Sequence, residues 1–125
     1  MGTDKKVGGE AGFAEGKTTE EWSVDFHDKA KKEFDGLDNS PKAQVAKAIH
    51  KVSQNPLPQS EGGYGKPLGN KQSSKLAGCL KIKLKSIGLR VVYQIIREDT
   101  VMKIIIISIR DDDDVYKEAE SRING

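Results

Sequence analysis

Two segments of the chain alternate hydrophobic and polar residues, which is the period of a half-buried β-strand. They are EWSVDF at residues 21–26 and CLKIKL at residues 79–84, where lysines alternate with aliphatic residues. A short turn at 86–88 follows the lysine strand, so we expect residues 89–97 to pair with it in antiparallel fashion. A further strand, VMKIIIISIR at 101–110, is aliphatic on both faces. This is typical of a strand that is covered on both sides or lies centrally in a sheet.

Three other segments repeat their hydrophobic residues at the helical period. The first helix follows the EWSVDF strand and ends at Gly36 or shortly after. The second is predicted to begin with Ser40 as its N-cap and Pro41 in the first helical position. The third follows the aspartates at 111–114, which suit the positive N-terminal end of a helix. The predicted buried stripes are Ala30, Phe34 and Leu37; Val45, Ile49 and Val52; and Val115, Ala119 and Ile123.

These elements follow the order β-α-α-β-β-β-α and predict an α+β fold. We expect a four-stranded, mostly antiparallel sheet with two N-terminal helices on one face and a short C-terminal helix. Because side chains alternate across a strand, the helices should cover the aliphatic face of the lysine strand. Lys81, Lys83 and Lys85 then lie on an open face, about 7 Å apart. Arg90 on the neighbouring strand joins them if the register allows.

The N-terminal 20 residues contain five glycines and no hydrophobic period. Residues 1–20 are therefore predicted to be a flexible tail, and residues 21–125 a single domain. The one cysteine excludes an internal disulfide framework, and no Cys and His residues have the spacing of metal ligands. No segment resembles a signal peptide or is long enough to cross a bilayer. We expect a cytoplasmic protein without a membrane partner.

Charge is distributed unevenly, although the net charge of the 125 residues is only +2. No Asp or Glu occurs between Glu61 and Glu98, and the rest of the chain is acidic. The basic residues of this interval are Lys66, Lys71, Lys75, Lys81, Lys83, Lys85, Arg90 and Arg97. If the interval folds together it forms an electropositive surface, which indicates an anionic partner such as nucleic acid. The alternative is that these are ordinary solubilising residues on an exposed sheet face.

Other residues with catalytic chemistry are less well placed. His27 and His50 have side chains that titrate near neutral pH, but one starts a predicted helix and the other lies inside one, away from the lysine strand. We expect neither to be catalytic. Cys79 has no evident histidine partner and is expected to be a small buried residue. Tyr93 lies on the opposite strand face from Arg90 and is expected in the core.

The sequence GCLKIKLKSIGLRVVYQII, followed by VMKIIIISI and DDVYKEAESRI, resembles the RelE toxins of the RelE/ParE superfamily. The resemblance covers residues 21–123 and includes the order of the elements. It implies a toxin of a type II toxin–antitoxin pair that cuts mRNA in the ribosomal A site. The implied partners are a cognate antitoxin, the ribosome and mRNA. The implied reaction is attack of a ribose 2′-hydroxyl on the adjacent phosphate, which leaves a cyclic phosphate without a metal or other cofactor.

The same resemblance implies the residues of the site. The positions that match the RelE motif are Lys81, Lys83, Arg90, Arg110 and Tyr116. Arg90 and Lys83 are expected to bind the scissile phosphate, because guanidinium and ammonium groups on rigid strands are preorganised for negative charge. Lys81 is the candidate general base if neighbouring cations lower its pKa. Arg110 would stabilise or protonate the leaving oxygen, and Tyr116 would orient the 2′-hydroxyl or stack on a base.

Three further lysines are expected to bind RNA without acting in the chemistry: Lys71, Lys75 and Lys85. The structural alternative applies to every one of these side chains, since surface lysines and arginines usually only interact with solvent.

The run Asp111–Asp114 departs from the RelE pattern, which places basic or mixed residues there. Four carboxylates beside Arg110 would repel RNA or hold the guanidinium in an ion pair; helix capping is the structural alternative. The main rival function is therefore a ParE-like toxin that poisons DNA gyrase without cutting RNA. A plain basic RNA-binding module is less well supported, because it would need exposed aromatic rings for stacking.

Overall fold

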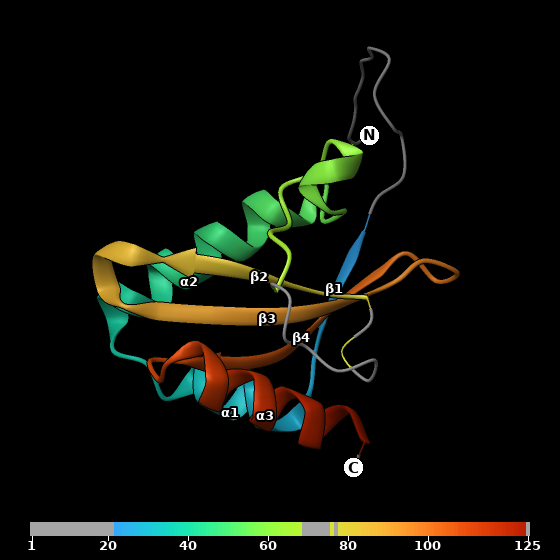
Figure 1. Ribbon diagram of the computed structural model, residues 1–125. Coiled ribbons are helices and arrows are strands. Elements are labelled where there is room, and N and C mark those ends of the chain that lie inside the picture. Colours follow the sequence, from blue (N-terminus) through green and yellow to red (C-terminus); the bar gives the residue numbers. More distant parts are fainter. Residues whose placement is uncertain (1–21, 69–75, 77, 125) are drawn as a thin grey trace.

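The computed structural model describes residues 22–68, 76 and 78–124. The predicted element order is confirmed, with two short 3-10 turns added (Figure 1). The elements are β1 (Ser23–Phe26), α1 (Asp28–Asp35), α2 (Asn39–Ser53), η2 (Gln59–Glu61), β2 (Cys79–Leu84), η4 (Lys85–Ile87), β3 (Leu89–Ile96), β4 (Val101–Ser108) and α3 (Asp112–Asn124). The predicted tail at 1–20 lies outside the described residues. No helix within the described ranges is long and apolar enough to cross a membrane.

The sheet has the strand order β1-β4-β3-β2. The β2–β3 and β3–β4 pairs are antiparallel and β1 pairs parallel with β4, so the mostly antiparallel sheet is confirmed. β4 lies between β1 and β3, and this inner position explains why its sequence is aliphatic on both faces.

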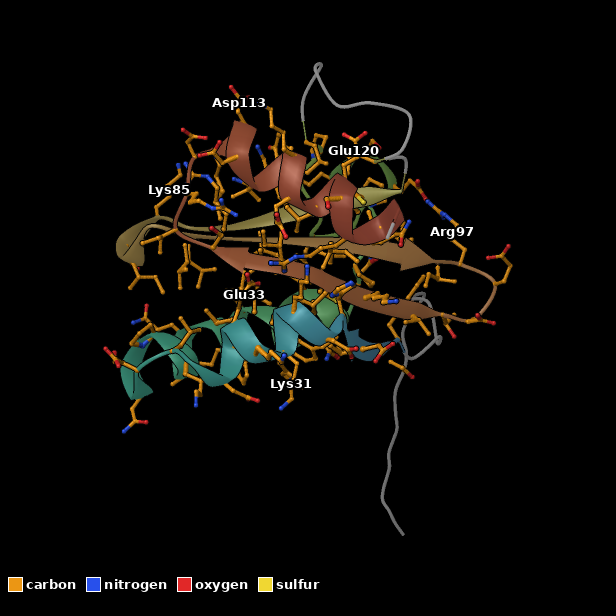
Figure 2. All side chains as sticks on the ribbon, turned by 90° about the horizontal axis from the view of Figure 1, so that it is seen from below. Lys31, Glu33, Lys85, Arg97, Asp113 and Glu120 are labelled. Carbon is orange, nitrogen blue, oxygen red and sulfur yellow. The ribbon has the colours of Figure 1, made fainter. Side chains whose placement is uncertain are left out.

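The first helices, α1 and α2, cover one face of the sheet and α3 covers the other (Figure 2). The core on the α1 and α2 side includes the predicted residues Ala30, Val45, Ile49, Val52, Leu80 and Ile82, together with Tyr93. The core on the α3 side is smaller and comprises Leu68, Leu76, Cys79, Val92, Ile105, Ile106, Val115 and Ala119. The sheet face that carries the lysines was expected to be open. This expectation was wrong where α3 packs against β3 and β4 on that face. The aliphatic residues of β3 and β4 on this side need a cover, which α3 provides.

A bulge in β4 enlarges this second core. Val92 pairs with Ile106, but the next residue, Tyr93, pairs with Ile104, so Ile105 has no partner on β3. Ile105 and Ile106 consequently both pack on the α3 side, although they are neighbours in the chain. The bulge gives α3 a broader apolar surface than strict alternation would supply.

The start of α2 differs from the prediction by two residues. Ser40 lies inside the helix, which begins at Asn39, and Asp38 precedes it. The carbonyl of Asp38 accepts a 2.9 Å hydrogen bond from the amide of Lys42, which is the first turn of the helix. Pro41 remains in that first turn, where its missing N–H costs no helical hydrogen bond.

The segment between α2 and β2 packs against the sheet. The buried hydroxyl of Tyr93 donates a 2.8 Å hydrogen bond to the carbonyl of Pro56. Gly65 passes so close that a Cβ built there would overlap that hydroxyl oxygen. The next residue, Lys66, exchanges backbone hydrogen bonds of 3.3 and 2.9 Å with Lys81. The pairing of Lys66 with Lys81 covers part of the outer edge of β2, the lysine strand.

Candidate active site

Lys83 and Arg90 are direct partners in the β2–β3 ladder. Lys81 precedes Lys83 by two residues and therefore projects from the same face of the sheet. The register thus brings Arg90 to the lysines, which is the condition on which it was expected to join them. Directly opposed like charges destabilise a sheet unless a counter-charge is near.

The counter-charge is Asp112, in the first turn of α3. Its Oδ1 lies 2.5 Å from Arg90 Nε, and its Oδ2 lies 3.7 Å from Lys81 Nζ and 3.9 Å from Lys83 Nζ. The Asp112 side chain retains 35% exposure, so the cluster is partly shielded from water. Arg90 also donates a 2.8 Å hydrogen bond from Nη1 to the carbonyl of Arg110. Three positive side chains therefore converge on one carboxylate.

The four aspartates do not share one role. The side chain of Asp111 accepts a 3.0 Å hydrogen bond from the amide of Asp114, so Asp111 caps α3 and the capping interpretation is correct for it. Asp113 and Asp114 are exposed. Asp112 pairs with Arg90, and within the described residues no carboxylate pairs with the guanidinium of Arg110. The expected ion pair therefore exists, but on a different arginine.

Tyr116 lies one helical turn after Asp112 and reaches the same cluster. Its hydroxyl accepts a 3.0 Å hydrogen bond from Lys81 Nζ, which lies 5.8 Å from the centre of the ring. The Lys81 side chain is only 13% exposed because Tyr116 and Asp112 cover it. The hypothesis that Lys81 is a general base assumes that the charged groups around it are all cations. The structure adds a neighbouring carboxylate, so the charges around Lys81 are mixed in sign.

The remaining predicted residues border this cluster. Lys85 and Arg110 are exposed, and Figure 2 shows Lys85 at the same end of the molecule as Asp113. A hollow of about 220 Å³ lies at the β2–β3 turn. It is lined by Lys83, Leu84, Lys85, Gly88, Leu89 and Arg90. Lys71 and Lys75 lie outside the described residues.

The other candidate residues have structural positions. The side chain of His27 accepts a hydrogen bond from the amide of Lys29 and caps α1, and His50 is exposed on α2. Burial raises the pKa of the Cys79 thiol to about 11, so this cysteine is an unreactive core residue, as expected. Within the described residues, no three His, Cys, Asp or Glu side chains gather as metal ligands do.

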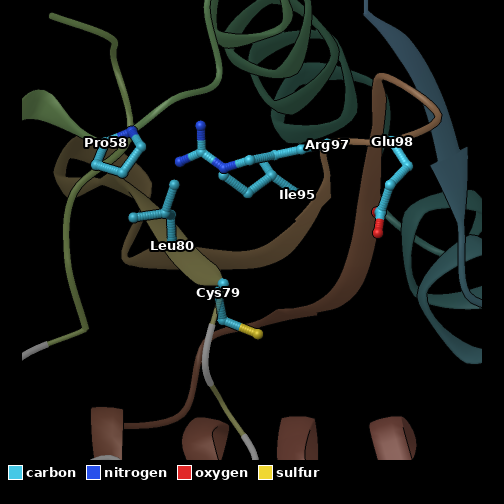
Figure 3. Close-up of a pocket in the computed structure, with 7 residues that line it drawn as sticks. Pro58, Cys79, Leu80, Ile95, Arg97 and Glu98 are labelled. Atoms are coloured by element: carbon cyan, nitrogen blue, oxygen red, sulfur yellow. The ribbon is translucent and has the colours of Figure 1, made fainter. Parts of the chain in front are cut away.

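A larger pocket, about 710 Å³, lies at the opposite end of the sheet (Figure 3). Its lining residues are Pro58, Gly78, Cys79, Leu80, Ile95, Arg97 and Glu98. Most of these are apolar. The guanidinium of Arg97 already forms two hydrogen bonds with the carboxylate of Glu61, at 3.1 and 2.8 Å. The convergent charges that chemistry on an anion needs are therefore found at the cluster around Asp112, of which Lys83 and Arg90 also line the smaller hollow.

The sequence analysis did not predict that Asp112, unlike the neighbouring aspartates, belongs to this cluster. A signal was present, because Asp112 and Tyr116 are four residues apart and side chains at that spacing share one face of a helix. Once Tyr116 was assigned to the site, Asp112 had to face the site as well.

The chain is similar in sequence to known proteins. The sequence profile of the family described as the ParE toxin of the type II toxin–antitoxin system parDE matches residues 24–116. The mRNA interferase toxin RelE of Escherichia coli strain K12 is 34% identical over 100 residues, which cover 80% of this chain and 95% of that protein. All five predicted catalytic positions lie within the residues that the profile matches.

Two solved structures have a similar fold. A mutant of the E. coli RelE toxin in the free state matches with a TM-score of 0.65 at 30% identity, covering 83% of this chain and 99% of that chain. A chain of the intact E. coli RelBE toxin–antitoxin complex matches with a TM-score of 0.56 at 30% identity, covering 72% and 98%.

Proposed function

Because this chain belongs to the RelE family of type II toxin–antitoxin toxins, we propose that it is an endoribonuclease that cuts mRNA on the ribosome and is restrained by a cognate antitoxin. The observation that carries the proposal is the convergence of Lys81, Lys83 and Arg90 on a single anionic position. Three cations on rigid strands, aimed at one point, suit a phosphate that gains negative charge during a reaction.

The proposed reaction conserves all atoms of the RNA. The 2′-oxygen of the ribose forms a bond to the adjacent phosphorus as the bond from phosphorus to the 5′-oxygen breaks. A base on the protein removes the 2′-proton, and the leaving 5′-oxygen receives a proton. The products are a cyclic phosphate and a free 5′-hydroxyl, and the protein must supply a proton acceptor, a proton donor and positive charge.

The geometry supports different roles for the five residues. Arg90 and Lys83 face the same point from adjacent strands and would hold the phosphate. Lys81 and Tyr116 share a hydrogen bond and would handle the 2′-proton as a pair. Arg110 is exposed beside Arg90 and would meet the leaving oxygen. Lys85 lies at the rim of the hollow, where it would contact RNA outside the reacting bond.

The ribosome would position the RNA in this scheme. Among the described residues, the half-buried Tyr116 is the aromatic ring in contact with the cation cluster, whereas the exposed Tyr64 packs against Lys51 on α2. A site with cations and one ring offers little base stacking to hold free RNA. Holding the mRNA in a fixed geometry on the ribosome replaces that binding by a gain in effective concentration. The proposed place of action is therefore the cytoplasm.

The decisive experiment is primer extension on mRNA in programmed ribosomes, with the same mRNA free in solution as a parallel arm. We expect strong cleavage of mRNA on ribosomes and little cleavage of the same mRNA free in solution. Arg90→Ala is the matched inactive variant. A supercoiling assay with purified DNA gyrase completes the test. Inhibition of gyrase with mRNA left intact would replace this proposal by the ParE-like function, and rapid cutting of free RNA would remove the ribosome from it.

A further inference from the structure

Asp112 lies where the site needs an anion, and its position is unusual for a capping residue. Asp111 already caps α3, so Asp112 is not required for that purpose. Its carboxylate instead contacts Arg90 through one oxygen and the two lysine ammonium groups through the other. Asp112 therefore uses both oxygens on the residues that the proposed reaction needs.

The contact with Arg90 is close but poorly aligned. Arg90 Nε and Asp112 Oδ1 are both buried, and although they lie 2.5 Å apart they do not meet the geometry of a hydrogen bond. A guanidinium forms its best contacts as two parallel hydrogen bonds to a planar or tetrahedral anion. Asp112 does not provide that arrangement, so Arg90 retains unused capacity for a better-shaped anion.

We propose that Asp112 is an internal competitor for the RNA phosphate. This inference rests on the proposed function in taking the cation cluster as the phosphate site. A carboxylate and a phosphodiester each carry one negative charge on two terminal oxygens, so they compete for the same three cations. RNA binds when its phosphate displaces the Asp112 side chain, and Asp112 lowers the apparent affinity by the fraction of time that it occupies the cluster.

The competition has a physical advantage for the free protein. Lys83 and Arg90 are directly opposed like charges, and Asp112 neutralises part of their repulsion while no RNA is bound. The substrate phosphate takes over that role on binding. Asp112 consequently sets how tightly RNA is bound, without being a catalytic residue.

Asp112→Asn is the direct test, because asparagine keeps the shape of the side chain and removes the charge. Asp113→Asn is the matched control. It makes the same charge change in the same turn of α3, but Asp113 is exposed and has no ion pair with a described residue. The two variants therefore share the effect on net charge and on the helix dipole, and differ in the contact with the cations.

The binding measurement uses the full purified chain and a fluorescein-labelled single-stranded deoxyoligonucleotide, which lacks the 2′-hydroxyl and cannot be cut by the proposed reaction. We expect Asp112→Asn to bind this probe roughly tenfold more tightly than the parent, since the substitution removes three partly exposed ion pairs that compete with the phosphate. Asp113→Asn should gain less than about twofold. Melting curves establish that both variants fold, and Asp112→Ser replaces Asp112→Asn if that variant unfolds.

Each outcome bears on the competition. Equal tightening in both variants would show a general charge effect and overturn it, and weaker binding by Asp112→Asn would show that Asp112 positions Arg90 instead. Cleavage on ribosomes is measured separately, and there Asp112→Asn should lower KM with little change in kcat. If no variant cuts mRNA but the difference in affinity remains, the proposed function fails and the competition stands. If the parent cuts mRNA and the two variants bind alike, only the competition fails.

Discussion

Glu33 and Arg122 meet at the point where β1 stops covering the edge of β4. β1 pairs with β4 only as far as Ile104, so the next outward-facing backbone groups of β4 have no strand beside them. Glu33 accepts a 3.0 Å hydrogen bond from the amide of Ile107, and Arg122 donates one of 2.8 Å to the carbonyl of Ile105. The two side chains also pair with each other at 2.9 and 2.7 Å. They continue the sheet hydrogen bonding and join α1 to α3.

The first prediction is that Arg122→Ala lowers the free energy of unfolding by about 3 kcal/mol, the low end of the range for breaking a buried ion pair. The low end applies because Arg122 is 6% exposed but Glu33 retains 29% exposure. Lys31→Ala is the control, since Lys31 and Asp35 form an exposed pair that should contribute less than about 0.5 kcal/mol. Urea unfolding followed by circular dichroism measures both. Similar losses in the two variants would contradict a special role for the Glu33–Arg122 pair.

The second prediction concerns the single cysteine. Burial raises the pKa of the Cys79 thiol to about 11, so the reactive thiolate is scarce in the folded protein at pH 8 and increases only as the pH approaches that value. A thiol-specific reagent such as DTNB should therefore react slowly at pH 8 in the native state and at the rate of a free thiol in urea. Fast labelling of the folded chain at pH 8 would mean that this part of the core opens readily.

The periodicity of the sequence was sufficient to predict the elements and the face that α1 and α2 cover. Alternation placed Leu80 and Ile82 in the core and the lysines on the opposite side, as the structure confirms. It did not reveal that α3 covers the lysine side, because a buried stripe on a helix does not specify the surface against which it packs. The bulge at Ile105 was also invisible, since an unbroken aliphatic run reads the same with or without an extra residue.

The basic residues of the cluster could be predicted from sequence, but the carboxylate that pairs with them could not. The sequence left the place of Arg90 dependent on the strand register, and the structure supplies that register by pairing Arg90 with Lys83. The sequence does not distinguish the four residues of the run Asp111–Asp114, because they differ only in the direction in which each side chain points from α3. Their directions follow from the residue at which α3 begins, and helix ends are difficult to locate from sequence within one or two residues. That uncertainty concealed the separate position of Asp112.

The third prediction separates the phosphate-binding cations from the rim. Lys83→Ala should lower single-turnover cleavage on ribosomes by about 10²-fold, near the loss reported for removing one preorganised donor. Lys85→Ala should lower it by less than about fivefold, because Lys85 is exposed beside the turn and has no ion pair with Asp112. Neither substitution removes a core side chain, so the melting temperatures of the two variants should differ little from that of the parent. Parental rates in Lys83→Ala would remove Lys83 from the catalytic set.

The last prediction decides between the ring and the hydroxyl of Tyr116. The hydroxyl accepts a hydrogen bond from Lys81, whereas the ring packs against the core under α3. Tyr116→Phe keeps the packing and removes the hydroxyl, so we expect kcat to fall by about 10²-fold, the lower range for a group that acts in proton transfer, with KM nearly unchanged.

Tyr64→Phe is the matched control for this change. Tyr64 is exposed and its ring lies 5.4 Å from Lys51 Nζ, in a different part of the molecule, so cleavage should remain at the parental rate. Tyr116→Ala removes the ring as well and should also lower thermal stability, which Tyr116→Phe should not. If Tyr116→Phe cuts ribosome-bound mRNA as fast as the parent and Tyr116→Ala does not, Tyr116 acts through its ring. The hydrogen bond to Lys81 would then only hold the lysine in place, and the 2′-proton would need another acceptor.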